Sequence, residues 1–207
     1  MNALAVEPDI QAAHDRDWAR LAAPGTWLTG AQRVAVARIA RGEDAQRGDV
    51  SEATAEAARR IHDAPATITN TWIDELETAG LNRLAYVEVL GVVSRLRALD
   101  TFTFGIGRPP REIPAPVAGD PSRAEVDGAS FDGGWVPTVG PAGPPNALSA
   151  VQIEHDGLHD LHGHLYLEAR GGDGNAMGNM SVVRNGINRS QMEFVAGRTS
   201  LLNDCFY

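Results

Sequence analysis

Apolar residues recur at helical spacing through most of the first hundred residues. The pattern predicts one helix over residues 9–22 and a second over 29–41, with Thr29 as the cap of the second. Ser51 opens an alanine-rich stretch with high helix propensity, which predicts a third helix. The chain therefore begins as a succession of short amphipathic helices.

Two more helices are expected before the apolar pattern breaks. Pro65 and Gly80 bracket the first, since proline favours the first turn of a helix and glycine favours its C-terminal cap. Residues 81–102 form the second, and their apolar side chains nearly encircle the helix. A helix that is apolar all round is buried, so we expect 81–102 at the centre of the fold.

Residues 105–145 break the helical pattern. They hold nine of the twelve prolines and eight glycines, which argues against a regular helix or a central strand. We interpret this connector as a plain linker, with a segment wrapped on the surface around Trp135 as the alternative. Asn146 or Ser149 is then expected to cap a helix that runs to about Ala169.

The C-terminal segment returns to a helical pattern after a glycine-rich loop at 170–179. The pattern predicts a helix from Ser190, as its cap, to about Leu202. Asn203 and Asp204 then indicate a turn or the cap of a new helix.

The two long apolar segments align weakly with each other. Placing YVEVLGVVSRLRALDTF over QMEFVAGRTSLLNDCFY pairs Glu88 with Glu193 and Asp100 with Cys205, both at an offset of 105 residues. We interpret the similarity as a faded duplication of a helical half.

The expected fold is therefore all-α, with two related helical halves. Residues 1–104 form the N-terminal half, 105–145 the connector, and 146–207 the C-terminal half. An apolar fraction of 43% is sufficient for a hydrophobic core, and 22% charged residues are typical of a globular protein.

Charge and cysteine content exclude several classes of function. A formal charge of −9 argues against non-specific binding to nucleic acid and to anionic membranes, which need clustered Lys and Arg. The single cysteine allows no internal disulfide, and the N-terminus has no signal-peptide pattern. These features predict a cytoplasmic protein without a membrane span.

The single cysteine, Cys205, lies twelve residues after Glu193. On one continuous helix this spacing places the two side chains about 120° apart. A break at Asn203 and Asp204 would instead put Cys205 at the start of a new helix, where the unpaired backbone N–H groups lower a thiol pKa. A carboxylate on the preceding helix could then act as a proton relay.

This arrangement resembles the active-site signature of the alkylhydroperoxidase D-like proteins, a helical group that includes the carboxymuconolactone decarboxylases. The family pattern is a Glu, a Cys twelve residues later, two residues, a second Cys, three residues and a His. Glu193 and Cys205 match the first two positions, and Phe206 and Tyr207 fill the next two. The segments GTWLTGAQRVAVA, YVEVLGVV, WVPTV and NALSAV also look like those of the longer, two-part members.

The resemblance implies a peroxidase-type oxidoreductase without an organic cofactor or a metal. The second redox residue would attack a peroxide, Cys205 would be the resolving thiol, and Glu193 would relay protons. The implied partners are a peroxide substrate and an external dithiol reductant, and the implied assembly is a homo-oligomer. Asp100 stands at the position that corresponds to Cys205, so the first half is not expected to perform thiol chemistry.

The second redox position would fall directly after Tyr207. Some relatives carry selenocysteine there, encoded by UGA, and our hypothesis is that NDCFY is the first part of a Cys-x-x-Sec centre. A natural or artificial truncation at the same point is the alternative.

Two other functions are compatible with the resemblance. One is a cofactor-free decarboxylase or lactone-processing enzyme, since such family members do not depend on the cysteine pair. The other is a non-enzymatic helical scaffold, for which the degenerate first half is a precedent.

Two further groups of polar residues have structural interpretations. His155, His159 and His162 recur at i, i+4 and i+7, a spacing that zinc sites use. The spacing is not specific, so we interpret these residues as a polar helix face, with a metal-binding module as the alternative. Glu88 is interpreted as a structural carboxylate paired with an arginine.

Overall fold

The chain is mostly helical in the computed structural model, as the apolar pattern predicted. It divides into two compact units, Met1–Leu161 and His162–Tyr207, each described here by itself. No helix among the described residues is long and apolar enough to cross a membrane. The structure describes residues 4–43, 49–143, 146–166, 183–184 and 186–202. The elements are α1 (Pro8–Ala22), α2 (Gly30–Ala40), α3 (Glu52–Asp63), the 3-10 turn η1 (Pro65–Thr67), α4 (Asn70–Thr78), α5 (Arg83–Gly105), α6 (Gln152–Tyr166), β1 (Val183–Arg184), β2 (Ile187–Asn188) and α7 (Arg189–Leu202).

The predicted cap of α2 is confirmed, and α3 begins directly after Ser51 as expected. The Thr29 hydroxyl accepts a hydrogen bond from the backbone N–H of Gln32, and the Gln32 side chain accepts one from the N–H of Thr29. This reciprocal capping box satisfies two backbone donors that the first turn leaves unpaired. Ser51 caps α3 in the same way, accepting from the N–H of Thr54.

The single helix predicted from Pro65 to Gly80 is wrong. Pro65 opens only the 3-10 turn η1, and α4 begins at Asn70. Thr69 interrupts the helix because its hydroxyl accepts a hydrogen bond from the N–H of Trp72 and so caps a new helix start. Gly80 ends the segment as predicted, with a φ of +98° that a side chain would disfavour.

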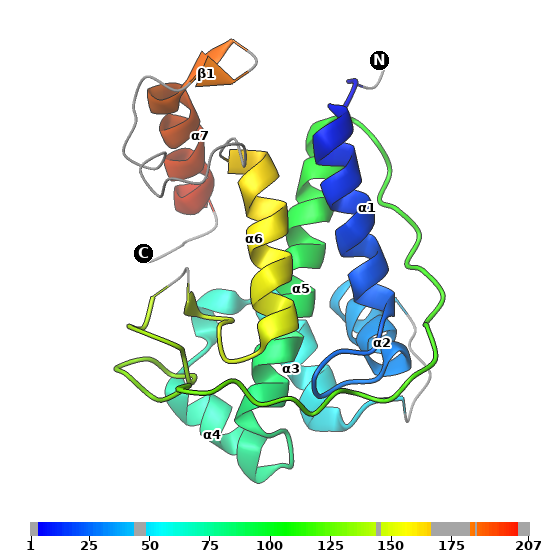
Figure 1. Ribbon diagram of the computed structural model, residues 1–207, viewed down its shortest axis with the longest axis vertical. Coiled ribbons are helices and arrows are strands. Elements are labelled where there is room, and N and C mark those ends of the chain that lie inside the picture. The colour runs from blue at the N-terminus through cyan, green and yellow to red at the C-terminus, as the bar shows by residue number, and fades with distance from the viewer. Residues whose placement is uncertain (1–3, 44–48, 144–145, 167–182, 185, 203–207) are drawn as a thin grey trace. The chain divides into compact units, whose positions relative to one another are not determined.

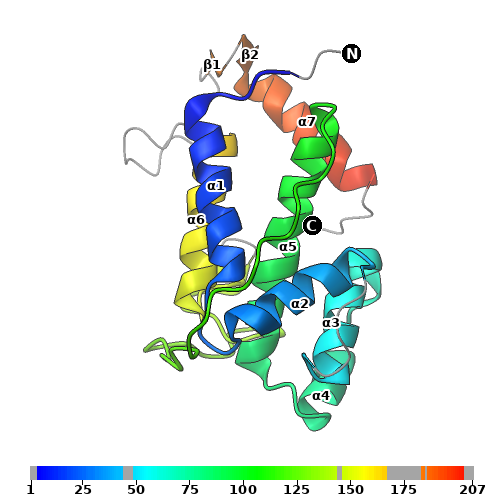
Figure 2. The same ribbon diagram turned by 90° about the vertical axis from the view of Figure 1, so that its right-hand side faces the viewer.

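α5 is the central buried helix that the sequence predicted. Asn82 caps it, and α1, α2 and α3 pack against it (Figures 1 and 2). Val87, Val89 and Leu96 are fully buried along its length. Val87 of α5 and Val151, the residue directly before α6, lie in a small apolar cluster, and Ile153 and Leu158 of α6 pack against it.

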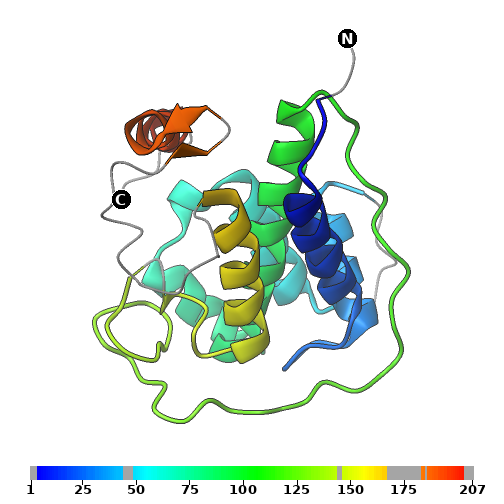
Figure 3. The same cartoon turned by 45° about the horizontal axis from the view of Figure 1, so that its top comes forward.

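The connector is anchored to the first unit more firmly than a plain linker would be. It runs from the end of α5 around the outside of α1 and back to the start of α6 (Figure 3). The backbone N–H groups of Val117, Ser122 and Arg123 donate hydrogen bonds to the carbonyls of Ala22, Gly25 and Thr26, respectively. The connector therefore lies as a strap over the loop that joins α1 to α2.

α6 begins later than expected. Asn146 and Ser149 lie in a turn, and the Ser149 hydroxyl accepts a hydrogen bond from the N–H of Val139 instead of capping a helix. The helix starts at Gln152 and is described to Tyr166. The predicted continuation to Ala169 and the glycine-rich loop lie outside the described residues.

α7 follows a two-stranded hairpin, and its cap is Asn188, not Ser190. The Asn188 side chain accepts from the N–H of Gln191, and the Gln191 side chain accepts from the N–H of Asn188. α7 is described to Leu202, in agreement with the predicted helix. The predicted turn at Asn203 and Asp204 lies outside the described residues, and the two related halves stay a prediction.

Candidate functional site

The predicted site residues Glu193 and Cys205 differ in what the structure describes. Glu193 lies in the second turn of α7 and is half-exposed, and its Oε1 accepts a hydrogen bond of 2.5 Å from Nε of Arg189. Arg189 lies four residues earlier on the same helix and is buried. Cys205 lies outside the described residues, and the predicted pairing of Glu193 with Cys205 therefore stays a prediction.

The three histidines of the predicted polar face, His155, His159 and His162, all lie on α6. The rings of His155 and His159 stack edge to face with their centroids 4.3 Å apart. Burial and the neighbouring His159 lower the pKa of His155, against a smaller opposing effect of Asp156. Within the described part of the chain, no three His, Cys, Asp or Glu side chains are grouped to hold a metal.

A buried ion-pair network fills the centre of the first unit. Nη1 of Arg33 donates to Oε1 of Glu88 and to Oε1 of Glu154, both at 2.6 Å, and all three side chains are fully buried. Arg95 extends the network by donating to Glu154 at 2.5 Å and to Asp17. Five charged side chains from four helices therefore meet in the core, and the predicted pairing of Glu88 with an arginine is confirmed.

Glu88 also fixes the loop that joins α1 to α2. Its Oε2 accepts hydrogen bonds from the backbone N–H groups of Thr26 at 3.0 Å and Trp27 at 2.6 Å. These donors, together with Arg33, occupy both oxygens of a carboxylate that has no access to water. Glu88 thus acts as an internal cap for the loop, and the connector strap holds the same loop from outside.

Burial and ion pairing shift the pKa values of the three carboxyl groups in opposite directions. Burial raises the pKa of Glu88 and of Asp17, more strongly than the adjacent Arg33 and Arg95 lower them. Burial also acts on Glu154, but Arg95 and Arg33 together outweigh it and hold the pKa of Glu154 below its usual range. Glu154 is therefore the carboxylate that the two guanidinium groups keep ionised.

Glycines make room for each part of the network. A Cβ added at Gly25 would lie 1.9 Å from Oε1 of Glu88, one at Gly91 would lie 2.3 Å from Oε2 of Glu154, and one at Gly157 would lie 2.1 Å from Nη1 of Arg95. These distances are shorter than any real Cβ contact. The loop after α1 approaches Glu88, and α5 and α6 approach each other, closely enough to form the ion pairs because these three positions have no side chain.

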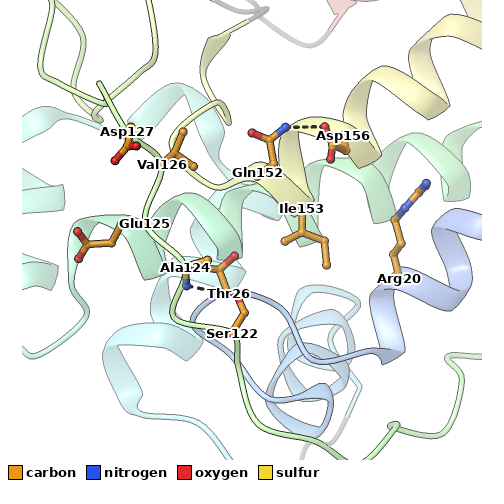
Figure 4. Close-up of a pocket in the computed structure, with 10 residues that line it drawn as sticks. All are labelled: Arg20, Thr26, Ser122, Ala124, Glu125, Val126, Asp127, Gln152, Ile153 and Asp156. Atoms are coloured by element: carbon orange, nitrogen blue, oxygen red, sulfur yellow. Dashed lines mark hydrogen bonds between the residues drawn. The ribbon is translucent and has the colours of Figure 1, made fainter.

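A pocket opens on the surface of the first unit beside this network (Figure 4). It has a volume of about 620 Å³. Arg20 of α1 and Thr26 of the following loop form one wall, and connector residues 122 and 124–127 form a second. The third wall is the beginning of α6, with Gln152 and Asp156.

The pocket was not predicted from the sequence, and of the network only the pairing of Glu88 with an arginine was. Part of the network had a signal in the sequence, because Glu88 and Arg95 are charged residues inside the largely apolar helical segment 81–102. Buried charges are rare unless they are paired, so such positions indicate partners. The pocket had no signal, since it depends on where the connector lies.

Comparisons with protein-family models, with curated proteins and with solved structures find no match to this chain. The resemblance to the alkylhydroperoxidase D-like group therefore stays a prediction based on the quoted motifs.

Proposed function

We propose that the protein is a thiol- or selenol-dependent peroxidase-type oxidoreductase that reduces hydroperoxides. The observation that carries the proposal is the Glu193–Cys205 spacing, at the end of a helix that is described to Leu202. Cys205 would form a redox pair with a second Cys or selenocysteine three positions later. The ion pair with Arg189 supports the proposal because it holds the Glu193 carboxylate in a defined position on the helix.

The reaction has three balanced steps. The thiolate or selenolate at the second position attacks the peroxide ROOH, takes one oxygen as sulfenic or selenenic acid, and releases the alcohol ROH after a proton transfer. The thiol of Cys205 condenses with that acid, which forms an S–S or Se–S bond and releases water. An external dithiol then reduces the bond and is itself oxidised to a disulfide.

Glu193 would serve the proton transfers in this cycle. A proton must reach the departing alkoxide in the first step, and another must leave Cys205 as it condenses. A positioned carboxylate that relays protons contributes typically about 10²- to 10⁴-fold in rate. The proposal needs neither a metal nor an organic cofactor.

The test uses a chain lengthened beyond Tyr207 so that a Cys occupies the next position and a His lies four positions after it. With tert-butyl hydroperoxide and dithiothreitol, we expect catalytic peroxide consumption by this chain and none by the 207-residue form. Cys205→Ser should slow turnover strongly and abolish the internal disulfide, because the sulfenic acid can then be reduced only by dithiothreitol itself. Glu193→Gln should lower the rate by about 10²-fold. Glu75→Gln, at an exposed position of α4, is the matched control and should leave the rate unchanged.

Two results would contradict the proposal. Absence of peroxide turnover in the lengthened chain would exclude the peroxidase function. A full rate in the 207-residue form would show that the attacking residue is wrongly assigned. Mass spectrometry of the resting oxidised protein provides a second readout, since the internal disulfide lowers the mass by two hydrogens.

A further inference from the structure

A second, smaller pocket of the first unit lies between α4, α5 and the last part of the connector, which Figures 1 and 3 draw beside α4. It has a volume of about 220 Å³. Its lining includes Ile73 of α4, Tyr86 and Leu90 of α5, and Trp135 and Val136 of the connector. No charged side chain belongs to the described lining, in contrast to the pocket beside the ion-pair network. We call it the aromatic pocket.

The connector keeps Trp135 at the aromatic pocket. Ser130 and Thr138, which flank it in the chain, exchange two backbone hydrogen bonds with N···O distances of 3.0 and 2.9 Å. The Thr138 hydroxyl, which also lines the pocket, donates to the carbonyl of Gly140 at 2.9 Å. Trp135 is nevertheless 50% exposed. Aromatic rings gain energy from contact with a second ring, so the uncovered half of this indole favours an aromatic ligand.

Tyr86 is fixed in the wall of the pocket by residues outside its lining. The Tyr86 ring meets the Trp72 ring edge to face with the centroids 6.2 Å apart, and the guanidinium of Arg60 lies 4.4 Å from the centre of the Trp72 ring. Trp72 and Tyr86 are both buried. The Tyr86 side chain therefore has a defined orientation before a ligand binds, which lowers the entropic cost of binding.

The hydroxyl of Tyr86 indicates a ligand with a neutral polar group. Tyr86 is 3% exposed, and its hydroxyl makes no hydrogen bond within the described part of the chain. The oxygen is not one of the fully enclosed atoms that lack a partner, so it stays accessible through the pocket that Tyr86 lines. Burial raises the pKa of Tyr86 to about 12, against a smaller effect of Arg83, so the group is neutral and can donate or accept. A wholly apolar ligand would cover it without a partner, which is unfavourable.

Volume and charge limit the ligand further. An apolar cavity of about 150 Å³ holds a benzene molecule. The aromatic pocket, at about 220 Å³, therefore has room for one ring with one or two small substituents. A charged ligand is disfavoured, because the described lining offers no opposite charge and the transfer of an unpaired charge out of water is costly.

We propose that the aromatic pocket binds a small, uncharged, monocyclic aromatic molecule with one hydroxyl group, of the alkylphenol class. The ring lies against the indole of Trp135, and the Tyr86 hydroxyl donates a hydrogen bond to the ligand oxygen. This binding is independent of the peroxidase proposal, because the whole described lining belongs to the first unit.

The experiment measures binding to the 207-residue chain by isothermal titration calorimetry at pH 7. The probes are 4-methylphenol, its non-aromatic analogue 4-methylcyclohexanol, and the anion 4-methylbenzoate. We expect saturable binding of 4-methylphenol with one molecule per chain. It should bind about fivefold more tightly than 4-methylcyclohexanol, because only the phenol ring can stack on Trp135. The anion should not bind.

Three variants locate the site. Trp135→Ala should weaken 4-methylphenol binding by about fivefold. Tyr86→Phe should weaken it by about threefold and leave the binding of toluene, which has no hydroxyl, without a loss. Phe104→Ala, at an 82% exposed aromatic position of α5 outside the lining, is the matched control and should change nothing. Trp135 is half-exposed, so its substitution tests the site even if the Tyr86 variant does not fold.

Several results would overturn the proposal. They are the absence of saturable 4-methylphenol binding, equal or tighter binding of 4-methylbenzoate, and a loss in Trp135→Ala no larger than that in Phe104→Ala. An equal loss of 4-methylphenol and toluene binding in Tyr86→Phe would contradict the hydrogen bond to the ligand oxygen.

Discussion

α5 and α7 carry the two segments that align at an offset of 105 residues, yet equivalent positions have opposite environments. Glu88 of α5 is fully buried and shares Arg33 with Glu154. Its counterpart in α7, Glu193, is 41% exposed and pairs with Arg189, four residues earlier. One carboxylate joins distant parts of the chain, and the other has a local partner on its own helix.

The apolar positions show the same contrast. Val89 and Leu96 of α5 are fully buried, whereas Phe194 and Leu201 at the corresponding positions of α7 are 78% and 66% exposed. α5 also continues past Asp100 to Gly105, without a break near the position that corresponds to Cys205. Sequence similarity between the two helices therefore does not imply that equivalent residues have the same role. The role of each glutamate follows from its own contacts.

The largest expected effect comes from removing Arg33 of α2, the cation that Glu88 of α5 shares with Glu154. Arg33→Met leaves Glu88 and Glu154 buried without it, and breaking a buried pair costs about 3–5 kcal/mol of unfolding free energy. Glu193→Gln in α7 should cost less than about 1 kcal/mol, because this pair is local and half-exposed. Urea unfolding followed by circular dichroism measures both, and similar losses in the two variants would contradict the contrast.

Replacing one glycine in each helix should change the stability by an intermediate amount, with opposite signs in α5 and α7. Gly91→Ala in α5 forces a methyl group to within 2.3 Å of Glu154, and overpacking of this kind costs about 1–3 kcal/mol. Gly197→Ala in α7 meets no described atom within 4 Å and should stabilise the helix by about 0.5–1 kcal/mol. The melting temperature should fall for the first variant and rise for the second, and a rise for both would show that the core of α5 is loosely packed.

Asp160, which pairs with Arg16 and Arg20, is less buried than Glu88 and less exposed than Glu193, and its contribution to stability should depend on pH. Hydrogen bonds from Arg16 and Arg20, together with their charges, lower the pKa of Asp160 to about 2. The unfolded chain binds this proton at higher pH, so the pair stabilises the fold above about pH 4. That stability is lost as the pH falls toward 2.

The variant Asp160→Asn isolates this contribution. At neutral pH it should be less stable than the wild type by no more than about 1 kcal/mol, since the pair is only partly buried. The difference should close between about pH 4 and pH 2 when unfolding is measured across that range. A constant difference down to pH 2 would mean that the variant acts through packing instead of charge.

Local signals in the sequence predicted the parts of the fold that local chemistry determines. Thr29, Ser51 and Gly80 each act on backbone groups within a few residues, and each was placed correctly. Two of the wrong predictions involve a neighbouring residue that caps the helix in place of the expected one. Thr69 caps a helix that begins at Asn70, in place of the one expected from Pro65. Asn188 caps α7 two residues before the expected Ser190.

The interior of the site could not be predicted in this way. Arg33 and Glu154 are 121 residues apart, and nothing near either residue specifies the other. The pocket depends on a connector whose position is fixed by backbone hydrogen bonds, which carry no side-chain signature in the sequence. The Glu193–Cys205 motif was visible because it is short and local, but its geometry depends on residues after Leu202.

The loop between α1 and α2 has a consequence for how the first unit opens. Its N–H groups are bound by a buried carboxylate of α5, and its carbonyls are bound by the connector. A surface loop usually fluctuates by itself at little cost in free energy, well below that of global unfolding. We expect no such independent motion of this loop, because releasing Thr26 and Trp27 leaves Oε2 of the buried Glu88 without its two donors. In folding terms it belongs to the same cooperative unit as the helices, although it has no regular secondary structure of its own.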